Sequence, residues 1–134
     1  MYTWVNHADE TWQKLWVESF PDEDFDPDRY TSNDELRYSL RSLNKYAPWL
    51  GKIHIVSNCS RPQWLDDDER INWVDHDSIF PDKDALPTFN SHAIEACLHR
   101  IEDQIEELNR KIAELRQEHV KTAQVATQQR LVAP

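Results

Sequence analysis

The chain has 134 residues and a formal net charge of −10, from 15 basic and 25 acidic side chains. This length predicts one domain, and the acidic balance argues against a nucleic-acid binder, which needs a basic surface. The single glycine, Gly51, excludes the phosphate-binding loop and the G-x-G-x-x-G turn, because each needs more than one glycine. Cys59 and Cys97 are isolated and predicted to be packed, inert thiols. With no signal-peptide pattern and no apolar run of membrane length, these features predict a cytoplasmic protein without a membrane span.

The composition changes along the chain. All tryptophans, tyrosines and phenylalanines lie between Tyr2 and Phe89. Residues 1–90 carry nine basic and eighteen acidic side chains, whereas residues 91–134 carry six and seven. The first part is therefore predicted to be a compact globular region with an aromatic core, and the second part to be one long helix.

The first thirty residues predict a strand, a helix and an acidic loop. Residues 2–5 form a short strand candidate, and residues 9–20 form a helix candidate with Trp12 and Trp16 four apart. Residues 21–32 are predicted to form a loop because they are acidic and contain two prolines. Their alternate aspartates lack the glycine and glutamate of an EF-hand loop, which argues against a calcium site.

The middle of the chain alternates between helix and strand patterns. Residues 33–46 predict a helix with Asn33 as its N-cap, and Pro48 ends it. Residues 53–57 contain a β-branched run, which predicts a buried strand, and residues 71–74 form a third strand candidate. Strands separated by helices imply a parallel sheet, and ligands bind such sheets at the carboxyl ends of the strands.

The tail carries a heptad pattern. Seven apolar residues recur four and three apart, which predicts an a/d seam in a helix that runs unbroken from about residue 90 to about residue 120. This seam either pairs with a second copy of the chain through residues 94–115 or folds back on the helix at residues 9–20. From residue 128 onward the helix is expected to fray. The seam residues are Ile94, Leu98, Ile101, Ile105, Leu108, Ile112 and Leu115.

Three charged side chains in the first part are candidates for binding a phosphate or a nucleotide. Arg37 and Arg41 lie four apart on one helix face and could fork onto a diphosphate. Alternatively, they form a solvated face that pairs with Asp34 or Glu35. Asp9 follows the first predicted strand, where it is either a ligand contact at the carboxyl end or a turn residue.

The start of the last helix holds a second group of candidates. Asn90 and Ser91 precede the helical pattern, where they cap the helix, contact a phosphate, or do both. Glu95 and His99 lie four apart and could hold a metal or a sugar hydroxyl, or form a simple polar pair. Arg100 follows on the same helix.

Two further polar groups are predicted to be structural. His76 and Asp77 are adjacent, and a loop pair is preferred over a carboxylate-oriented imidazole. The acidic run at residues 66–69 is interpreted as a solvated helix end.

Five segments occur in a recognisable order along the chain. They are Tyr2-Thr3-Trp4-Val5-Asn6, Asn33-Asp34-Glu35-Leu36-Arg37-Tyr38-Ser39-Leu40-Arg41-Ser42, Ala47-Pro48-Trp49, Pro62-Gln63-Trp64-Leu65 and Leu86-Pro87-Thr88-Phe89-Asn90-Ser91-His92-Ala93-Ile94-Glu95. In this order they resemble the Stealth family of capsular polysaccharide phosphotransferases, which is similar to the catalytic subunit of the lysosomal-enzyme N-acetylglucosamine-1-phosphotransferase. The resemblance covers roughly residues 2–102.

The resemblance implies a Rossmann-like catalytic fold and a defined reaction. A sugar 1-phosphate passes from a nucleotide sugar, usually UDP-linked, to a hydroxyl of a glycan acceptor, with a divalent metal such as Mg or Mn. It also implies that Trp4 and Asn6 lie near the base and ribose, that Arg41 is a substrate contact, and that Glu95 is a structural or substrate-facing residue.

The tail departs from the family pattern. The family's Asn-Asp-Asp segment and its later catalytic histidine have no counterpart after Glu102, where a heptad helix follows. The expected organisation is therefore an α/β fold, with a partial Rossmann-like parallel sheet in residues 1–102 and a coiled-coil-like helix with a frayed tail in residues 103–134. The function expected is sugar-1-phosphate transfer in capsule or exopolysaccharide biosynthesis, with the chain incomplete and inactive alone. The alternatives are a non-catalytic fragment or fusion with an oligomerisation helix, and a nucleotide-sugar binding module without turnover.

Overall fold

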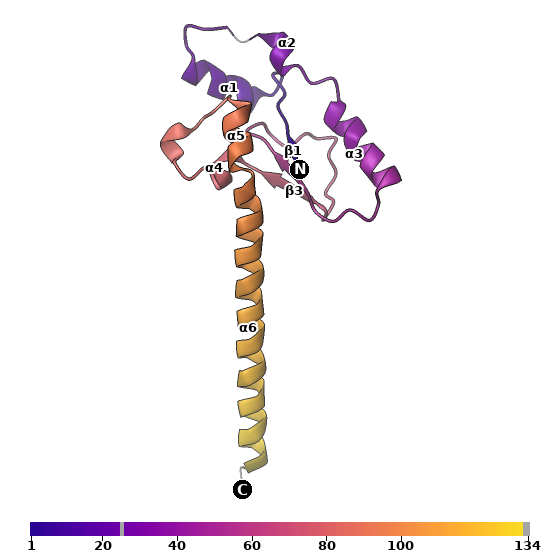
Figure 1. Ribbon diagram of the computed structural model, residues 1–134, viewed down its shortest axis with the longest axis vertical. Coiled ribbons are helices and arrows are strands. Elements are labelled where there is room, and N and C mark those ends of the chain that lie inside the picture. Colours follow the sequence, from indigo (N-terminus) through magenta and orange to yellow (C-terminus); the bar gives the residue numbers. More distant parts are fainter. Residues whose placement is uncertain (25, 133–134) are drawn as a thin grey trace. The chain divides into compact units, whose positions relative to one another are not determined.

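The computed structural model describes the backbone of residues 1–24 and 26–132 and the side chains as far as residue 123 (Figure 1). The chain forms two compact units, Met1–Cys97 and Leu98–Pro134. The first unit holds a small sheet with helices around it, and the second is a single long helix. This arrangement confirms the predicted α/β fold with a long C-terminal helix.

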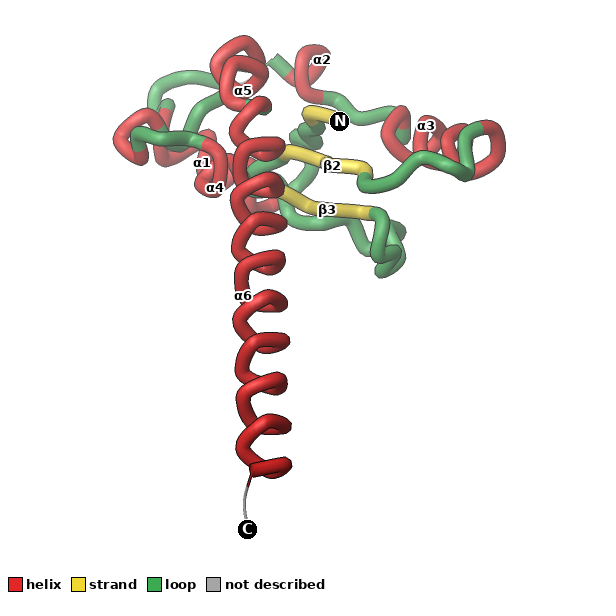
Figure 2. Tube along the Cα trace, turned by 60° about the horizontal axis from the view of Figure 1, so that its bottom comes forward, coloured by secondary structure: helices red, strands yellow, loops and turns green. Residues whose placement is uncertain are grey.

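A three-stranded parallel sheet lies at the centre of the first unit. Its strands β1 (Tyr2–Thr3), β2 (Ile53–Val56) and β3 (Ile71–Val74) follow the order β1-β2-β3, and Figure 2 shows them side by side. The predicted parallel pairing is therefore confirmed. The first strand is shorter than the expected 2–5, although the Trp4 amide still donates to the Val56 carbonyl at 3.0 Å.

Local capping explains where the short helices begin. The helices of the first unit are α1 (Glu10–Ser19), α2 (Pro27–Tyr30), α3 (Glu35–Tyr46), α4 (His76–Ile79) and α5 (Ser91–Cys97), with a 3-10 turn at Lys83–Ala85. The carboxylate of Asp9 caps α1 by accepting from the Trp12 amide at 2.9 Å. Within the segment expected to be loop, Asp26 caps α2 and Pro27 occupies its first position, so one helical turn forms.

The start of α3 differs from the prediction. Asp34, not Asn33, occupies the N-cap position, with a left-handed φ of 63° and no side-chain cap bond. Instead, the Glu35 carboxylate accepts from the Asn33 backbone amide at 2.8 Å and from its side-chain amide at 3.2 Å. The predicted N-cap role of Asn33 is therefore wrong, because its side chain donates to Glu35 rather than accepting from the helix.

The core holds two clusters, and Trp4 packs against both. Ile53 and Ile55 pack with Leu36 of α3, whereas Trp12 and Trp16 of α1 pack with Cys59 in an aromatic-rich cluster. Ile55 and Val56 are both fully buried, as expected for a central strand that is covered on both faces. The aromatic core predicted for the first part of the chain is thus present.

The second unit consists of α6 (His99–Val132) preceded by Leu98. The predicted unbroken helix is wrong at Leu98, where a turn separates α5 from α6. The Ile101 amide donates to the Leu98 carbonyl at 3.1 Å. This i to i−3 bond makes a tighter turn than the i to i−4 bonds of a regular α-helix. Fraying was expected from residue 128 onward, but α6 continues as a helix through residues 128–132; residues 133–134 lie outside the described residues.

The apolar seam of α6 is exposed from Ile105 to Leu115, whereas Ile101 near the start of the helix is buried. Ile105, Leu108, Ile112 and Leu115 are 37%, 58%, 38% and 65% exposed.

Among the helices of the described residues, none combines the length and apolar composition that a membrane span needs.

Candidate functional site

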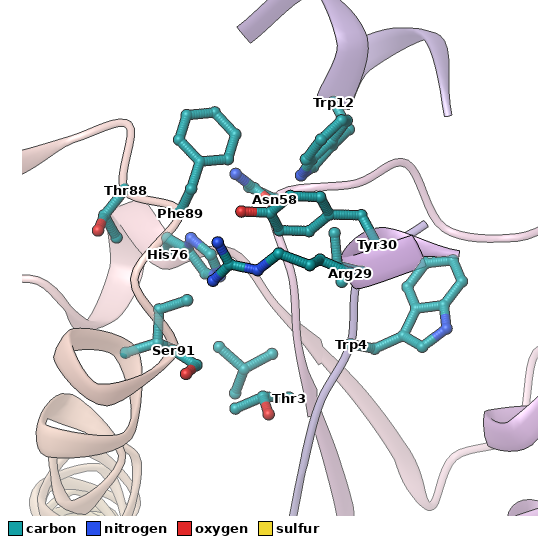
Figure 3. Close-up of a pocket in the computed structure, with 13 residues that line it drawn as sticks. Thr3, Trp4, Trp12, Arg29, Tyr30, Asn58, His76, Thr88, Phe89 and Ser91 are labelled. Carbon is teal, nitrogen blue, oxygen red and sulfur yellow. The ribbon is translucent and has the colours of Figure 1, made fainter. Parts of the chain in front are cut away.

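The carboxyl ends of all three strands open onto one cavity of about 200 Å³ (Figure 3). Trp4 follows β1, Asn58 lies two residues beyond β2, and His76 lies two residues beyond β3. Parallel topology brings these three positions to the same edge of the sheet, which is where α/β folds bind their ligands. We call this space the carboxyl-edge cavity.

Helices and loops supply the remaining wall of the carboxyl-edge cavity. Arg29 and Tyr30 come from α2, Phe89 and Ser91 come from the start of α5 and the segment before it, and Trp12 comes from α1. The aromatic rings also hold one another, since the ring centroids of Trp12 lie 5.0 Å from Tyr30 and 5.6 Å from Phe89. The other lining residues are Thr3, Val5, Val56, Thr88 and Ile94.

Buried polar groups without partners converge on this cavity. The Nδ2 of Asn58 and the Nδ1 of His76 are buried and have no hydrogen-bond partner among the described residues. The Nε1 of Trp4 is also buried without a hydrogen-bond partner among the described residues, but Figure 3 shows it directed away from Arg29. A buried polar atom left unsatisfied costs about 1–3 kcal/mol, so each such atom needs an explanation. A ligand that carries oxygen acceptors would satisfy Asn58 directly.

Charge in the carboxyl-edge cavity comes from Arg29. Arg29 is exposed, and its guanidinium carbon lies 5.7 Å from the ring centroid of Tyr30, which also lines the cavity (Figure 3). Burial lowers the pKa of His76 below its usual 6.5, and the nearby Asp75 carboxylate opposes this shift only in part. His76 is therefore neutral at pH 7, which leaves Arg29 as the one ionised side chain in the described lining.

His76 was expected to form a loop pair with Asp77, and the structure corrects this. His76 is the buried first residue of α4, 4% exposed, whereas Asp77 is exposed and pairs with Lys83 at 2.9 Å.

Cys59 is buried, and burial raises the pKa of its thiol, so it stays protonated at neutral pH. This agrees with the packed, inert thiol predicted at Cys59.

The structure brings two of the predicted site residues, Trp4 and Ser91, to the carboxyl-edge cavity. Asn6 and Asp9 do not line it. The Asn6 side chain accepts from the Ala8 amide at 3.1 Å, and the Asp9 carboxylate is occupied as the α1 cap.

The remaining candidates on the last helices are dispersed. Asn90 caps α5, because its Oδ1 accepts from the His92 amide at 3.0 Å and the Ala93 amide at 3.4 Å. Glu95 is exposed on α5. His99 and Arg100 belong to the second unit.

Arg37 and Arg41 line a different cavity, of about 320 Å³. Its wall includes Ile53 and Ile71, the first residues of β2 and β3, so it lies at the amino ends of these strands. We call it the amino-edge cavity. Residues 47–52 join α3 directly to the start of β2, and this short connection keeps Arg41 at that end of the sheet. The structure thus does not bring Arg41 to the cavity that Trp4 and Ser91 line.

Sequence reasoning missed three residues of the carboxyl-edge cavity. Asn58 and His76 each follow a correctly predicted strand by two positions, and this spacing could have identified them. Arg29 gives no comparable signal, because it lies in a segment that was expected to be loop.

The side chains that the structure describes do not form a divalent-metal site. Within residues 1–24 and 26–132, no three His, Cys, Asp or Glu side chains lie close enough together to hold a metal ion. The lining of the carboxyl-edge cavity contains His76 but no carboxylate.

A parallel sheet with a cavity at its carboxyl edge is the arrangement in which α/β folds bind their ligands. The model of the family described as Stealth protein CR2, conserved region 2, matches residues 29–125, and the chain belongs to the Stealth family. This match extends into α6.

Characterised relatives carry phosphotransferase names. The chain is 48% identical over 105 residues to the exopolysaccharide phosphotransferase SCO6023 of Streptomyces coelicolor, a match that covers 75% of this chain and 18% of the relative. It is 47% identical over 105 residues to the capsular polysaccharide phosphotransferase SacB of Neisseria meningitidis serogroup A, covering 75% of this chain and 19% of the relative. The chain thus spans about a fifth of the length of these relatives.

Proposed function

We propose that the chain contributes the donor-binding part of a sugar-phosphate transferase for capsular or exopolysaccharide biosynthesis. The names of relatives at 47% and 48% identity support the reaction class. The single observation that carries the proposal is the carboxyl-edge cavity, whose lining combines the cationic Arg29 with Asn58 and His76, each of which has a buried, unpartnered polar atom. The ligand proposed for it is a nucleotide sugar, UDP-linked, in a Rossmann-like setting.

The chemistry of the lining suits a diphosphate with an attached base. The Arg29 guanidinium can donate two parallel hydrogen bonds to phosphate oxygens, and the Asn58 amide can donate a third. The half-buried rings of Tyr30 and Phe89, held from behind by the buried Trp12, offer faces on which a flat base can stack. The Ser91 hydroxyl adds a polar group near the mouth of the cavity, where this residue is exposed.

Phosphoryl transfer relies mainly on positioning and on charge stabilisation. In the proposed reaction, the acceptor hydroxyl attacks the phosphorus that carries the sugar, and its proton leaves to a base. The bond from that phosphorus to the bridging oxygen breaks, and the nucleoside monophosphate departs with that oxygen. Arg29 would stabilise the charge that develops on the phosphate oxygens, while neutral His76 would bind an oxygen without adding charge.

The divalent metal remains a prediction, because the described residues include no cluster of His, Cys, Asp or Glu side chains that could hold it. The chain spans 18% and 19% of these two relatives, and the described carboxyl-edge cavity offers no carboxylate to act as a base. We therefore propose that the 134 residues bind the donor but do not complete transfer alone.

We also propose that α6 pairs with a second copy of the chain in a coiled coil. The exposed residues Ile105, Leu108, Ile112 and Leu115 support this, because their 4-3-4-3 spacing continues from Ile101 along one face of the helix. Such a stripe is self-complementary between identical helices.

Calorimetric titration of the 134-residue chain with UDP-sugar tests the donor site. Arg29→Ala should weaken binding about 10- to 100-fold, the range for a lost charged hydrogen bond, and Arg29→Lys should keep part of the affinity. Arg41→Ala is the matched control, since it removes an exposed arginine from the amino-edge cavity and should leave donor affinity unchanged. Unchanged affinity in Arg29→Ala would reject the site.

A further inference from the structure

The amino-edge cavity gathers positive charge in an acidic chain. Three of the nine lysines and arginines in residues 1–97 line it, namely Arg37, Arg41 and Arg70. Two carboxylates, Asp66 and Asp68, line it as well. The lining therefore keeps one net positive charge, whereas residues 1–90 as a whole carry nine excess negative charges.

Within the amino-edge cavity, Arg70 and Asp68 form an ion pair with each other. Arg70 donates to both oxygens of Asp68, at 2.7 Å for its Nη2, and its hydrogen bonds lower the pKa of that carboxyl to about 2. The same guanidinium also donates to the Asn44 side-chain oxygen at 3.2 Å. Asp68 is thus ionised and occupied at neutral pH, so it does not compete for the other two arginines.

Arg37 and Arg41 remain available to a ligand. The Nη1 of Arg37 lies 3.9 Å from the Asp34 carboxylate, which is the limit of an ion pair between two half-exposed groups. Arg41 has no hydrogen bond or ion pair among the described residues, and it is exposed one turn further along α3. Two guanidinium groups one helical turn apart match phosphate oxygens well.

Trp64 adds an aromatic face to this cation pair. Its side chain is half-buried in the wall of the amino-edge cavity, and the Arg37 guanidinium carbon lies 5.8 Å from its ring centroid. The apolar face of a sugar ring packs on an indole, while its charged substituents reach flanking donors. An indole beside two arginines, of which Arg41 has no partner among the described residues, therefore suits a saccharide that carries phosphate.

We propose that the amino-edge cavity binds a phosphodiester-containing glycan, the growing polymer on which the transferase acts. This inference rests on the proposed function. The two cavities lie at opposite ends of β2, whose first and last residues are three steps, or about 10 Å, apart. The amino-edge cavity would therefore hold a unit of the polymer behind its reacting end, while the acceptor hydroxyl itself lies at the donor.

Titration of the 134-residue chain with a synthetic tetrasaccharide of phosphodiester-linked hexoses tests this proposal. Arg41→Ala should weaken its binding at least tenfold, and Arg41→Lys should retain part of it. Lys45→Ala is the matched control, because Lys45 is an exposed cation on the same helix but does not line the cavity. Trp64→Phe should bind the tetrasaccharide more weakly while circular dichroism confirms that it is folded.

Two further probes identify what is recognised. The same tetrasaccharide with neutral glycosidic links and inorganic phosphate alone should each bind at least tenfold more weakly. Binding that is absent, that is equal for the neutral probe or for phosphate, or that falls equally in Lys45→Ala would overturn the proposal. A chain that binds UDP-sugar but not the tetrasaccharide would contradict this inference alone, and the opposite result would contradict the donor site alone.

Discussion

Replacing Trp12 with alanine removes the largest fully buried side chain among the described residues, 1% exposed. Its indole contacts the rings of Trp16, Tyr30 and Phe89, with centroids 5.3, 5.0 and 5.6 Å away. Tyr30 and Phe89 both line the carboxyl-edge cavity, so Trp12 supports the proposed donor site as well as the core. Trp12→Ala should therefore weaken folding and donor binding together.

The size of this loss follows from burial. Tryptophan-to-alanine changes in a core cost about 3–5 kcal/mol, from the transfer of the side chain and the cavity left behind. The whole free energy of unfolding of a small domain is about 5–15 kcal/mol, so the change removes a large share of it. With a urea slope of about 1–3 kcal/mol per molar, the unfolding midpoint should fall by roughly 2 M.

Urea unfolding followed by far-ultraviolet circular dichroism measures this shift. Val17→Ala is the control, because Val17 lies on the same helix and is 62% exposed, so its midpoint should stay nearly unchanged. Trp12→Phe should fall between the two. A loss below about 1 kcal/mol in Trp12→Ala would refute the packing described for this cluster.

Three other predictions concern titration, assembly and turnover. Because burial lowers the pKa of His76, the unfolded chain binds more protons below pH 6.5, so the free energy of unfolding should fall as pH drops from 6.5 towards the folded-state pKa. Thermal unfolding between pH 7.5 and 5.5 should show this fall, and a His76→Gln variant with an equal fall would contradict it. Sedimentation at tens of micromolar should show a dimer or higher oligomer that Leu108→Asp with Ile112→Asp converts to monomer, whereas Asn109→Asp does not; a wild-type monomer would leave self-association unsupported. The purified chain should form no phosphodiester product from UDP-sugar and a glycan acceptor, and metal-dependent turnover would prove the donor-binding-only proposal wrong.

Local patterns determined the parts of this fold that could be predicted. The β-branched run located the central strand β2 at Ile53–Val56, and the Ile, Trp and Val side chains located the neighbouring strand β3 at Ile71–Val74, each to within one residue, because such side chains fit a pleated, half-buried surface. The turn at Leu98 could not be predicted, since the apolar spacing continues through it without a change. A heptad shows which residues share a helix face, but it does not show where one helical turn tightens.

The candidate site was predictable in its place but only partly in its residues. Topology alone located it at the carboxyl edge, and Trp4 and Ser91 do line the cavity there. Arg29, Asn58 and His76 were missed because their importance lies in burial and in the absence of partners, which depend on how distant segments pack. Arg41 lies at the opposite edge from Trp4 and Ser91. Its position in the helix does not show this, because the edge depends on the short connection from α3 to β2.

The location of the donor is the central claim, and chemical-shift mapping of the isotope-labelled chain during a UDP-sugar titration tests it most directly. The account predicts saturable shifts at the backbone amides of Trp4, Asn58 and His76 and at the Asn58 side-chain amide, with the amides of Arg41 and Arg70 at the opposite edge unchanged. Shifts confined to Arg41, Arg70 and their neighbours, or no saturable shifts at all, would contradict it.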